Sequence, residues 1–153
     1  MNSPYLYWWF KKIFKKEFCE AVIKHALQKQ EKMALTGDLK NPDKLTKKQL
    51  KDLKKIRNSD VIFFNDRWII NEIVPFIHDA NINAGWNFDI DYAEDMQFTI
   101  YKKGQFYGWH KDCDDKPYTD HKNENMNGKI RKLSCSIVLS DSKNYKGGEL
   151  LFE

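Results

Sequence analysis

The sequence contains few cysteines, few arginines and no long apolar run, and each shortage excludes a class of protein. The three cysteines, Cys19, Cys113 and Cys135, are too few and too irregularly spaced for a disulfide framework, which favours a reducing compartment. No apolar stretch approaches the roughly 20 residues that a membrane helix needs. The aromatic opening MNSPYLYWWF lacks the basic segment and the small-residue cleavage site of a signal peptide. We therefore predict a cytoplasmic protein that is not associated with a membrane.

The composition is that of a folded domain. The 153 residues are 41% hydrophobic and 14% aromatic, which is too apolar for a disordered chain despite 31% charged residues. This length is sufficient for one domain with its own hydrophobic core. No internal repeat or low-complexity linker divides it, so we expect a single domain over residues 1–153.

The positive charge is concentrated in residues 40–57. This segment holds eight basic and two acidic residues, a local charge of +6, whereas the whole chain carries +4 and the remainder therefore about −2. The segment is either a solvated loop and helix face or a surface for an acidic partner. Nucleic acid is the less favoured partner, because the chain has only three arginines and arginine makes the bidentate contacts to bases and phosphates.

The hydrophobic pattern predicts an α+β domain in which helices precede strands. In the first part we expect a strand over 5–10, a helix over 15–33, a short polar helix over 47–56, a strand over 59–64 and a helix over 67–85 that Pro75 reshapes. From Gly85 onward the pattern becomes that of strands. We predict them over 86–90, 96–101, 105–112, 132–140 and 148–153, with a tight turn at Gly104 between the second and the third.

His110 and Asp112 stand two residues apart after a strand-like run. On a strand, side chains i and i+2 lie on the same face, so an imidazole and a carboxylate would point the same way. These are two arms of a 2-His-1-carboxylate iron site, which a histidine from a distant strand would complete. A strand-end histidine followed by a turn aspartate gives the same spacing, and chance produces it readily among four histidines and fourteen aspartates.

The residues around this pair decide between the alternatives. The stretch QFTIYKKGQFYGWHKD and the later RKLSCSIVLSDSKNYKGGELLF resemble the prolyl 4-hydroxylase-like branch of the 2-oxoglutarate/Fe(II)-dependent dioxygenases, including its phage and bacterial members. The resemblance covers most of the chain and is strongest over 80–152. It implies a double-stranded β-helix core of the jelly-roll or cupin-like type, with residues 1–84 as a supporting strand and helices and 85–153 as the front part of the core.

The resemblance also implies roles for individual residues. His110 and Asp112 match the first two Fe(II) ligands, and Tyr101 matches a tyrosine that contacts 2-oxoglutarate. Three further side chains match the wall of the substrate pocket: Tyr107, Trp109 and Arg131. For Arg131, a surface charge at the start of a strand is an equal alternative.

The reaction that the resemblance implies is hydroxylation of an unactivated C–H bond, with dioxygen consumed and succinate and carbon dioxide released. A prolyl or related residue of a peptide is the expected substrate, with a small molecule as the alternative, and ascorbate is the expected reductant. The long polar loop over 113–129 is the expected substrate lid.

The family pattern includes a distal histidine and, after it, an arginine or lysine for 2-oxoglutarate. The only histidine after Asp112 is His121, which lies too close along the chain to be the expected third ligand. We therefore expect the jelly-roll to be incomplete at its C-terminus, the chain to be part of a longer protein, and apolar side chains such as Ile137, Leu139 and Leu150 to be poorly covered. The alternative function is a non-catalytic jelly-roll binding module or inactive fragment, whose basic segment 40–57 meets an acidic partner.

Overall fold

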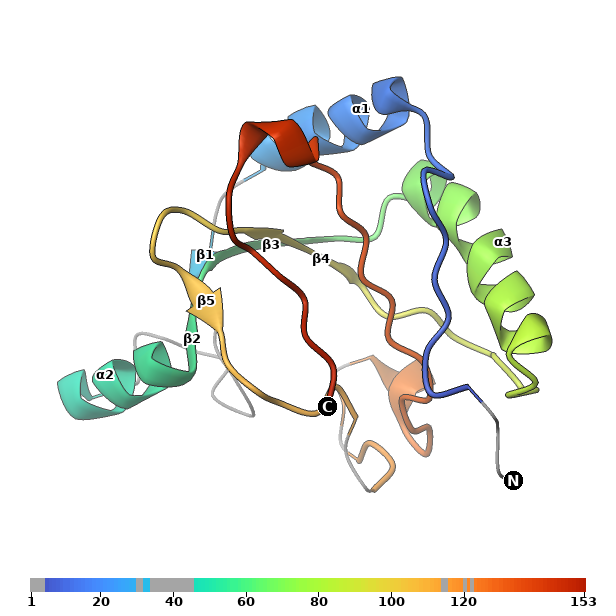
Figure 1. Cartoon of the computed structure of the whole chain (residues 1–153). Helices are drawn as coiled ribbons and strands as arrows, with labels where there is room; N and C mark the ends of the chain where they lie inside the picture. Colours follow the sequence, from blue (N-terminus) through green and yellow to red (C-terminus); the bar gives the residue numbers. More distant parts are fainter. Residues whose placement is uncertain (1–4, 30–31, 34–45, 114–115, 120, 122) are drawn as a thin grey trace. The chain divides into compact units, whose positions relative to one another are not determined.

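A computed structural model describes residues 5–29, 32–33, 46–113, 116–119, 121 and 123–153 (Figure 1). The chain divides into two compact units. The first comprises Met1–Phe18, Asn65–Asp95 and Lys111–Val138, and the second comprises Cys19–Phe64, Met96–His110 and Leu139–Glu153. The described residues include helices and small antiparallel sheets, which confirms the α+β class. None of the helices in this described part is long and apolar enough to cross a membrane.

Helix α1 (Lys16–Leu27) confirms the first predicted helix, although it ends earlier than the pattern indicated. Its apolar face buries Val22 and Ala26, and it continues from the first unit into the second. In the second unit, the ring of His25 meets that of Phe64 edge-on, with 5.8 Å between centroids. This contact places α1 against the central strand of that unit.

Helix α2 (Lys47–Ile56) has the predicted bounds. Thr46 caps its N-terminus: the Gln49 backbone N–H donates to the Thr46 hydroxyl, and the Thr46 backbone N–H donates to the Gln49 side chain. This reciprocal pair explains why a helix with no buried residue begins so sharply. At its other end Arg57 becomes extended and the chain enters a strand. Residues 40–45 of the basic segment lie outside the described residues.

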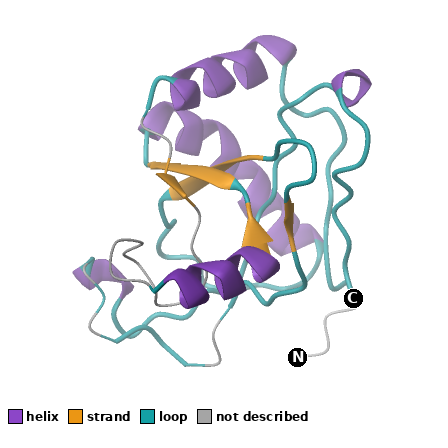
Figure 2. Ribbon diagram, turned by 90° about the vertical axis from the view of Figure 1, so that its left-hand side faces the viewer, coloured by secondary structure: helices purple, strands orange, loops and turns teal. Residues whose placement is uncertain are grey.

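The strands of the second unit form two small antiparallel sheets (Figure 2). Strand β3 (Asp60–Phe64) lies between β1 (Lys32–Met33) and β4 (Met96–Ile100), and β2 (Arg57–Asn58) pairs with β5 (Phe106–Tyr107). Val61, Ile62 and Phe64 are buried and supply the core of this unit.

The segment 57–64 therefore pairs with 96–107 twice, and the intervening residues 101–105 bulge out. Asp60 is opposite Ile100, whereas Asn58 is opposite Phe106. The predicted turn is present, with Gly104 at φ +78° and the Gln105 N–H donating to the Lys102 carbonyl over 2.9 Å. The strands on either side of this turn do not pair with each other, and each pairs instead with the same earlier segment.

Helix α3 (Arg67–Asn83) dominates the first unit and confirms the predicted helix, with Pro75 inside it. Its ring side chains meet those of residues 10–18 at centroid distances of 5.4–5.9 Å, in a cluster of Phe10, Phe14, Phe18, Trp68 and Phe76. Ile69 and Ala84 are buried as well. The predicted strand over 5–10 was wrong: these residues form no strand, and the ring of Phe10 meets that of Phe76 on the helix.

The predicted strand over 86–90 was also wrong, and Asn81 gives the reason. This buried side chain donates to the Phe88 carbonyl over 2.9 Å and accepts from the Phe88 N–H over 3.0 Å. The backbone groups that a strand would use are thus bound to a side chain at the end of α3.

Residues 105–112 form only the two-residue strand β5, and residues 132–140 and 148–153, all described, form no strand. Val138, Leu150 and Phe152 are 69%, 58% and 67% exposed. An apolar, β-prone run becomes a strand only when a neighbouring strand pairs with its backbone. These segments have the predicted composition without that neighbour.

Candidate functional site

The ring of Tyr107, in the second unit, contacts two other planar side-chain groups. Its cross-strand partner Arg57 places the guanidinium carbon 4.3 Å from the phenol centroid. The imidazole of His110 lies 3.6 Å from the same centroid, with 13° between the ring planes. Arg57 and His110 therefore both contact the ring of Tyr107.

The backbone next to His110 determines how its ring is presented. The Nδ1 atom of His110 lies 2.8 Å from the Gly108 carbonyl oxygen, a hydrogen bond that requires a proton on Nδ1. In the neutral ring the lone pair is then on Nε2. Histidines that bind metals generally donate their other nitrogen to a carbonyl or carboxylate in this way, which orients the ring.

Gly108 itself is tied to helix α2. Its N–H donates to the Ile56 carbonyl over 2.8 Å, and a Cβ on Gly108 would approach that oxygen to 3.3 Å. The end of α2 thus fixes the backbone from which His110 projects. A side chain at residue 108 would push these two segments apart.

Arg57 is buried, with 6% of its surface exposed. Its Nε donates to the Ser59 hydroxyl over 3.0 Å and its Nη1 to the Gln97 side chain over 3.3 Å. Nη2 has no hydrogen-bond partner among the described residues. In the sequence, Arg57 was identified only as one of the basic residues of 40–57, and its buried role was not predicted. The change from a lysine-rich helix to a single arginine at the start of a strand was the available indication.

Asp112 belongs to the first unit, where Arg131 holds its backbone. The Nε atom of Arg131 donates to Glu94 over 2.7 Å, Nη2 donates to the other oxygen of Glu94, and Nη1 donates to the Asp112 carbonyl. The hydrogen bonds to Glu94 raise the pKa of Arg131 above its ordinary value, so it stays charged. Arg131 is a half-buried anchor for the Asp112 segment, and its contact with a substrate stays a prediction. Nothing in the sequence pattern pointed to Glu94.

The spacing of His110 and Asp112 predicted that both lie on one strand, but the structure places neither of them on a strand. Strand β5 ends at Tyr107, and the chain bends at Trp109 and again at Asp112. Both side chains of the pair are exposed. They belong to different units, so each is positioned by its own surroundings: His110 by Tyr107, and Asp112 by Arg131.

The other predicted site residues are accessible. Tyr101 directly follows β4 and is 51% exposed, and Trp109 is 63% exposed. Tyr107 is half-buried. The structure therefore brings Tyr107 into contact with His110. The contact of Tyr101 with 2-oxoglutarate and the place of Trp109 in the pocket wall stay predictions.

The predicted lid is more ordered than its sequence indicated. The Tyr118 N–H donates to the Lys129 carbonyl, the Gly128 N–H donates to the Tyr118 carbonyl, both over 2.9 Å, and the short 3-10 helix η2 (Glu124–Met126) buries Met126. Residues 114, 115, 120 and 122 of this loop lie outside the described part. The Nδ1 atom of His121 accepts from the Asn123 N–H over 3.1 Å, so the loop itself holds this imidazole.

Among the residues that the structure describes, no three His, Cys, Asp or Glu side chains gather as a metal site. The imidazole of His110 and the carboxylate of Asp112 are donors of the kind that suits Fe(II), and their assignment as ligands stays a prediction. The chain matches no protein-family model, no curated protein and no solved structure. The residues themselves therefore carry the functional assignment.

Proposed function

We propose that the chain is a non-haem Fe(II)- and 2-oxoglutarate-dependent dioxygenase domain, built on a jelly-roll core, that hydroxylates a prolyl or related residue of a peptide. The observation that supports it best is the hydrogen bond between His110 Nδ1 and the Gly108 carbonyl. This bond leaves the lone pair on Nε2, which is the form that a metal ligand needs.

Each residue in the proposal has a defined task. His110 and Asp112 would hold Fe(II), which supplies the activation of dioxygen for hydroxylation. Tyr107 and Arg57 orient the His110 ring, and Arg131 fixes the backbone of Asp112. Tyr101 would donate its hydroxyl to a carboxylate of 2-oxoglutarate. The proposal requires a third protein ligand, which the resemblance expects to be a distal histidine.

The proposed substrate follows from the same resemblance. Trp109 is 63% exposed and immediately precedes His110, so it offers ring surface next to the proposed metal ligand. Ring faces of this kind suit the apolar ring of a prolyl residue. Ascorbate would serve as the reductant.

Selective line broadening tests the metal assignment without requiring tight binding. Mn(II) added to the full chain is expected to broaden the NMR signals of His110 well before those of the exposed His78, because Mn(II) occupies the same donors as Fe(II). Asp112→Asn should reduce the broadening at His110 by about threefold or more. His78→Ala is the matched control and should leave it unchanged.

One outcome would contradict the metal assignment, and activity assays test the rest of the proposal. Equal broadening of His110 and His78 would contradict the assignment of His110 as a ligand. With Fe(II), ascorbate and a prolyl peptide, His110→Ala should abolish any 2-oxoglutarate-dependent succinate release, whereas Tyr101→Phe should mainly weaken the binding of 2-oxoglutarate. An unchanged affinity in Tyr101→Phe would refute the role of that hydroxyl.

A further inference from the structure

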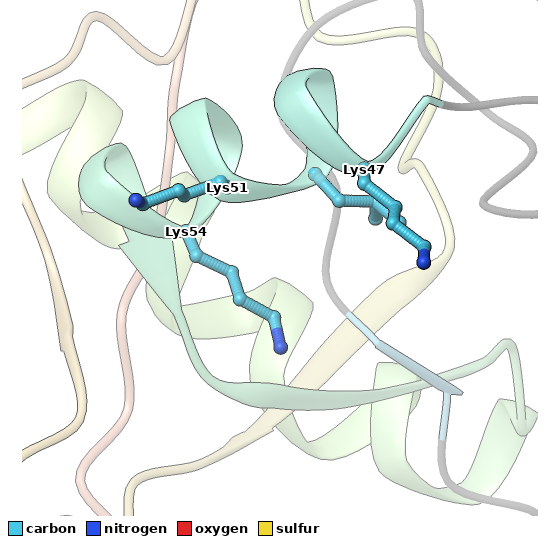
Figure 3. A pocket seen from close by; sticks show the side chains of 4 residues that line it. Lys47, Lys51 and Lys54 are labelled. Atoms are coloured by element: carbon cyan, nitrogen blue, oxygen red, sulfur yellow. The ribbon is translucent and has the colours of Figure 1, made fainter.

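One face of helix α2 carries a hollow lined by Lys47, Leu50, Lys51 and Lys54, with a volume of about 310 Å³. Figure 3 shows the three lysine side chains extending from successive turns of this helix. At a rise of about 1.5 Å per residue, the positions i, i+4 and i+7 space the backbones of the three lysines along roughly 10 Å of the helix.

The cationic face is not neutralised by the described residues. Asp52, the only acid in α2, pairs with Lys55 over 2.8 Å. No described residue forms a hydrogen bond or ion pair with the ammonium groups of Lys47, Lys51 and Lys54. Like charges at i and i+4 destabilise a helix, and here the Thr46–Gln49 capping box offsets that cost.

The floor of the hollow is apolar. Leu50 is half-buried between the lysines, and lysine stems present methylene groups below their charged ends. An apolar floor with a cationic rim complements an apolar side chain flanked by carboxylates. Bases and sugar-phosphates are a poorer fit, because this face offers no arginine and no aromatic ring for stacking.

We infer that the α2 face formed by Lys47, Leu50, Lys51 and Lys54 binds an acidic segment of another protein, with an apolar residue between its carboxylates. The ammonium groups contact the carboxylates and Leu50 contacts the apolar side chain. This is a statement about binding and does not depend on the proposed iron chemistry.

Fluorescence anisotropy with a labelled peptide tests this inference. The probe has glutamates around one central leucine, and the protein is the full chain at low ionic strength. The triple variant Lys47→Glu, Lys51→Glu, Lys54→Glu is expected to weaken binding by about tenfold or more, because it reverses every charge on the face. The matched control reverses three exposed lysines outside α2, Lys103→Glu, Lys143→Glu and Lys146→Glu, and should change the affinity by less than about twofold.

Two further arms make the test decisive. The native chain should bind a peptide with serine in place of its leucine several-fold more weakly than the leucine peptide. Leu50→Asn should bind the two peptides with similar affinity, because the floor of its hollow is already polar. Equal weakening by the two triple variants, or no binding at all, would overturn the inference. Tighter binding of a single-stranded oligonucleotide of equal charge would also overturn it, in favour of nucleic acid. Far-UV circular dichroism of each variant confirms that α2 is retained.

Discussion

The guanidinium carbon of Arg57 lies 4.3 Å from the ring centroid of its cross-strand neighbour Tyr107. This contact buries a cation whose Nη2 has no hydrogen-bond partner in the described part of the chain. Burial of an unpaired polar group costs free energy, whereas the apolar stem and the ring contact stabilise the fold. The balance of these two effects at Arg57 can be measured.

We expect Arg57→Met to change the free energy of unfolding by less than about 1 kcal/mol, because methionine keeps most of the volume and removes the unpaired charge. Arg57→Ala should lower it by about 2–4 kcal/mol through loss of packing and the cavity that remains. Urea unfolding measures both, and the exposed Arg67→Met is the control. A methionine variant as unstable as the alanine variant would show that the polar contacts of Arg57 carry its stabilising effect.

The tautomer of His110 is a second expectation. The hydrogen bond from Nδ1 to the Gly108 carbonyl predicts that the neutral ring carries its proton on Nδ1. Nitrogen-15 NMR distinguishes the two tautomers directly. Tyr107→Leu should increase the population of the other tautomer, because the ring loses the stacking contact that holds it. Predominance of the Nε2-protonated form in the native chain would contradict the structure and weaken the proposed metal role.

The ion pair between Arg131 and Glu94 should be measurably coupled. Its bidentate geometry and partial burial, with both side chains 34% exposed, favour a coupling free energy of about 1–2 kcal/mol. A double-mutant cycle with Arg131→Gln and Glu94→Gln measures it. The more exposed pair of Lys129 and Asp91 provides the comparison, for which we expect less than about 0.5 kcal/mol. Equal coupling in the two pairs would contradict the anchoring role of Arg131.

Cys19 should react slowly with an alkylating reagent. Burial raises the pKa of its thiol, so less of the reactive thiolate is present at pH 8 than in a free cysteine. The raised pKa stabilises the fold below the ordinary thiol pKa, and this contribution is lost as the pH rises through the folded value. In single-cysteine variants, iodoacetamide should modify Cys19 several-fold more slowly than the exposed Cys113. A Cys19 rate profile identical to that of a free thiol would refute the shift.

The local elements could be predicted from the sequence, because the forces that define them act within one turn. Helix α2 has the predicted bounds because Thr46 and Gln49 form the cap at its N-terminus, from which its polar residues continue. Helix α3 and strand β4 were likewise predicted from periodicity alone. The strands predicted over 132–140 and 148–153 are absent from the structure, because a strand depends on a partner far away in the chain, and apolar composition does not specify that partner.

The candidate site shows the same division. His110 and Asp112 were identified by their spacing and by the residues around them. Arg57 was missed because its role depends on the register that places it opposite Tyr107, and on Gln97, 40 residues further along the chain. Glu94 was missed for the same reason, since its partner Arg131 is 37 residues away. Side-chain partners across long sequence distances cannot be derived from local pattern.

Asn81 provides the last prediction, and it tests why the expected strand over 86–90 is absent. Asn81→Ala removes two hydrogen bonds and leaves both backbone groups of Phe88 without their partner in a site where Asn81 is 5% exposed. We expect a loss of about 2–4 kcal/mol in the free energy of unfolding, and faster hydrogen exchange at the Phe88 amide. Asn83→Ala removes one exposed hydrogen bond to the Asp79 carbonyl and should cost less than about 1 kcal/mol. If the two variants were equally stable, Asn81 would not be the residue that holds this segment, and the absence of the strand would need another cause.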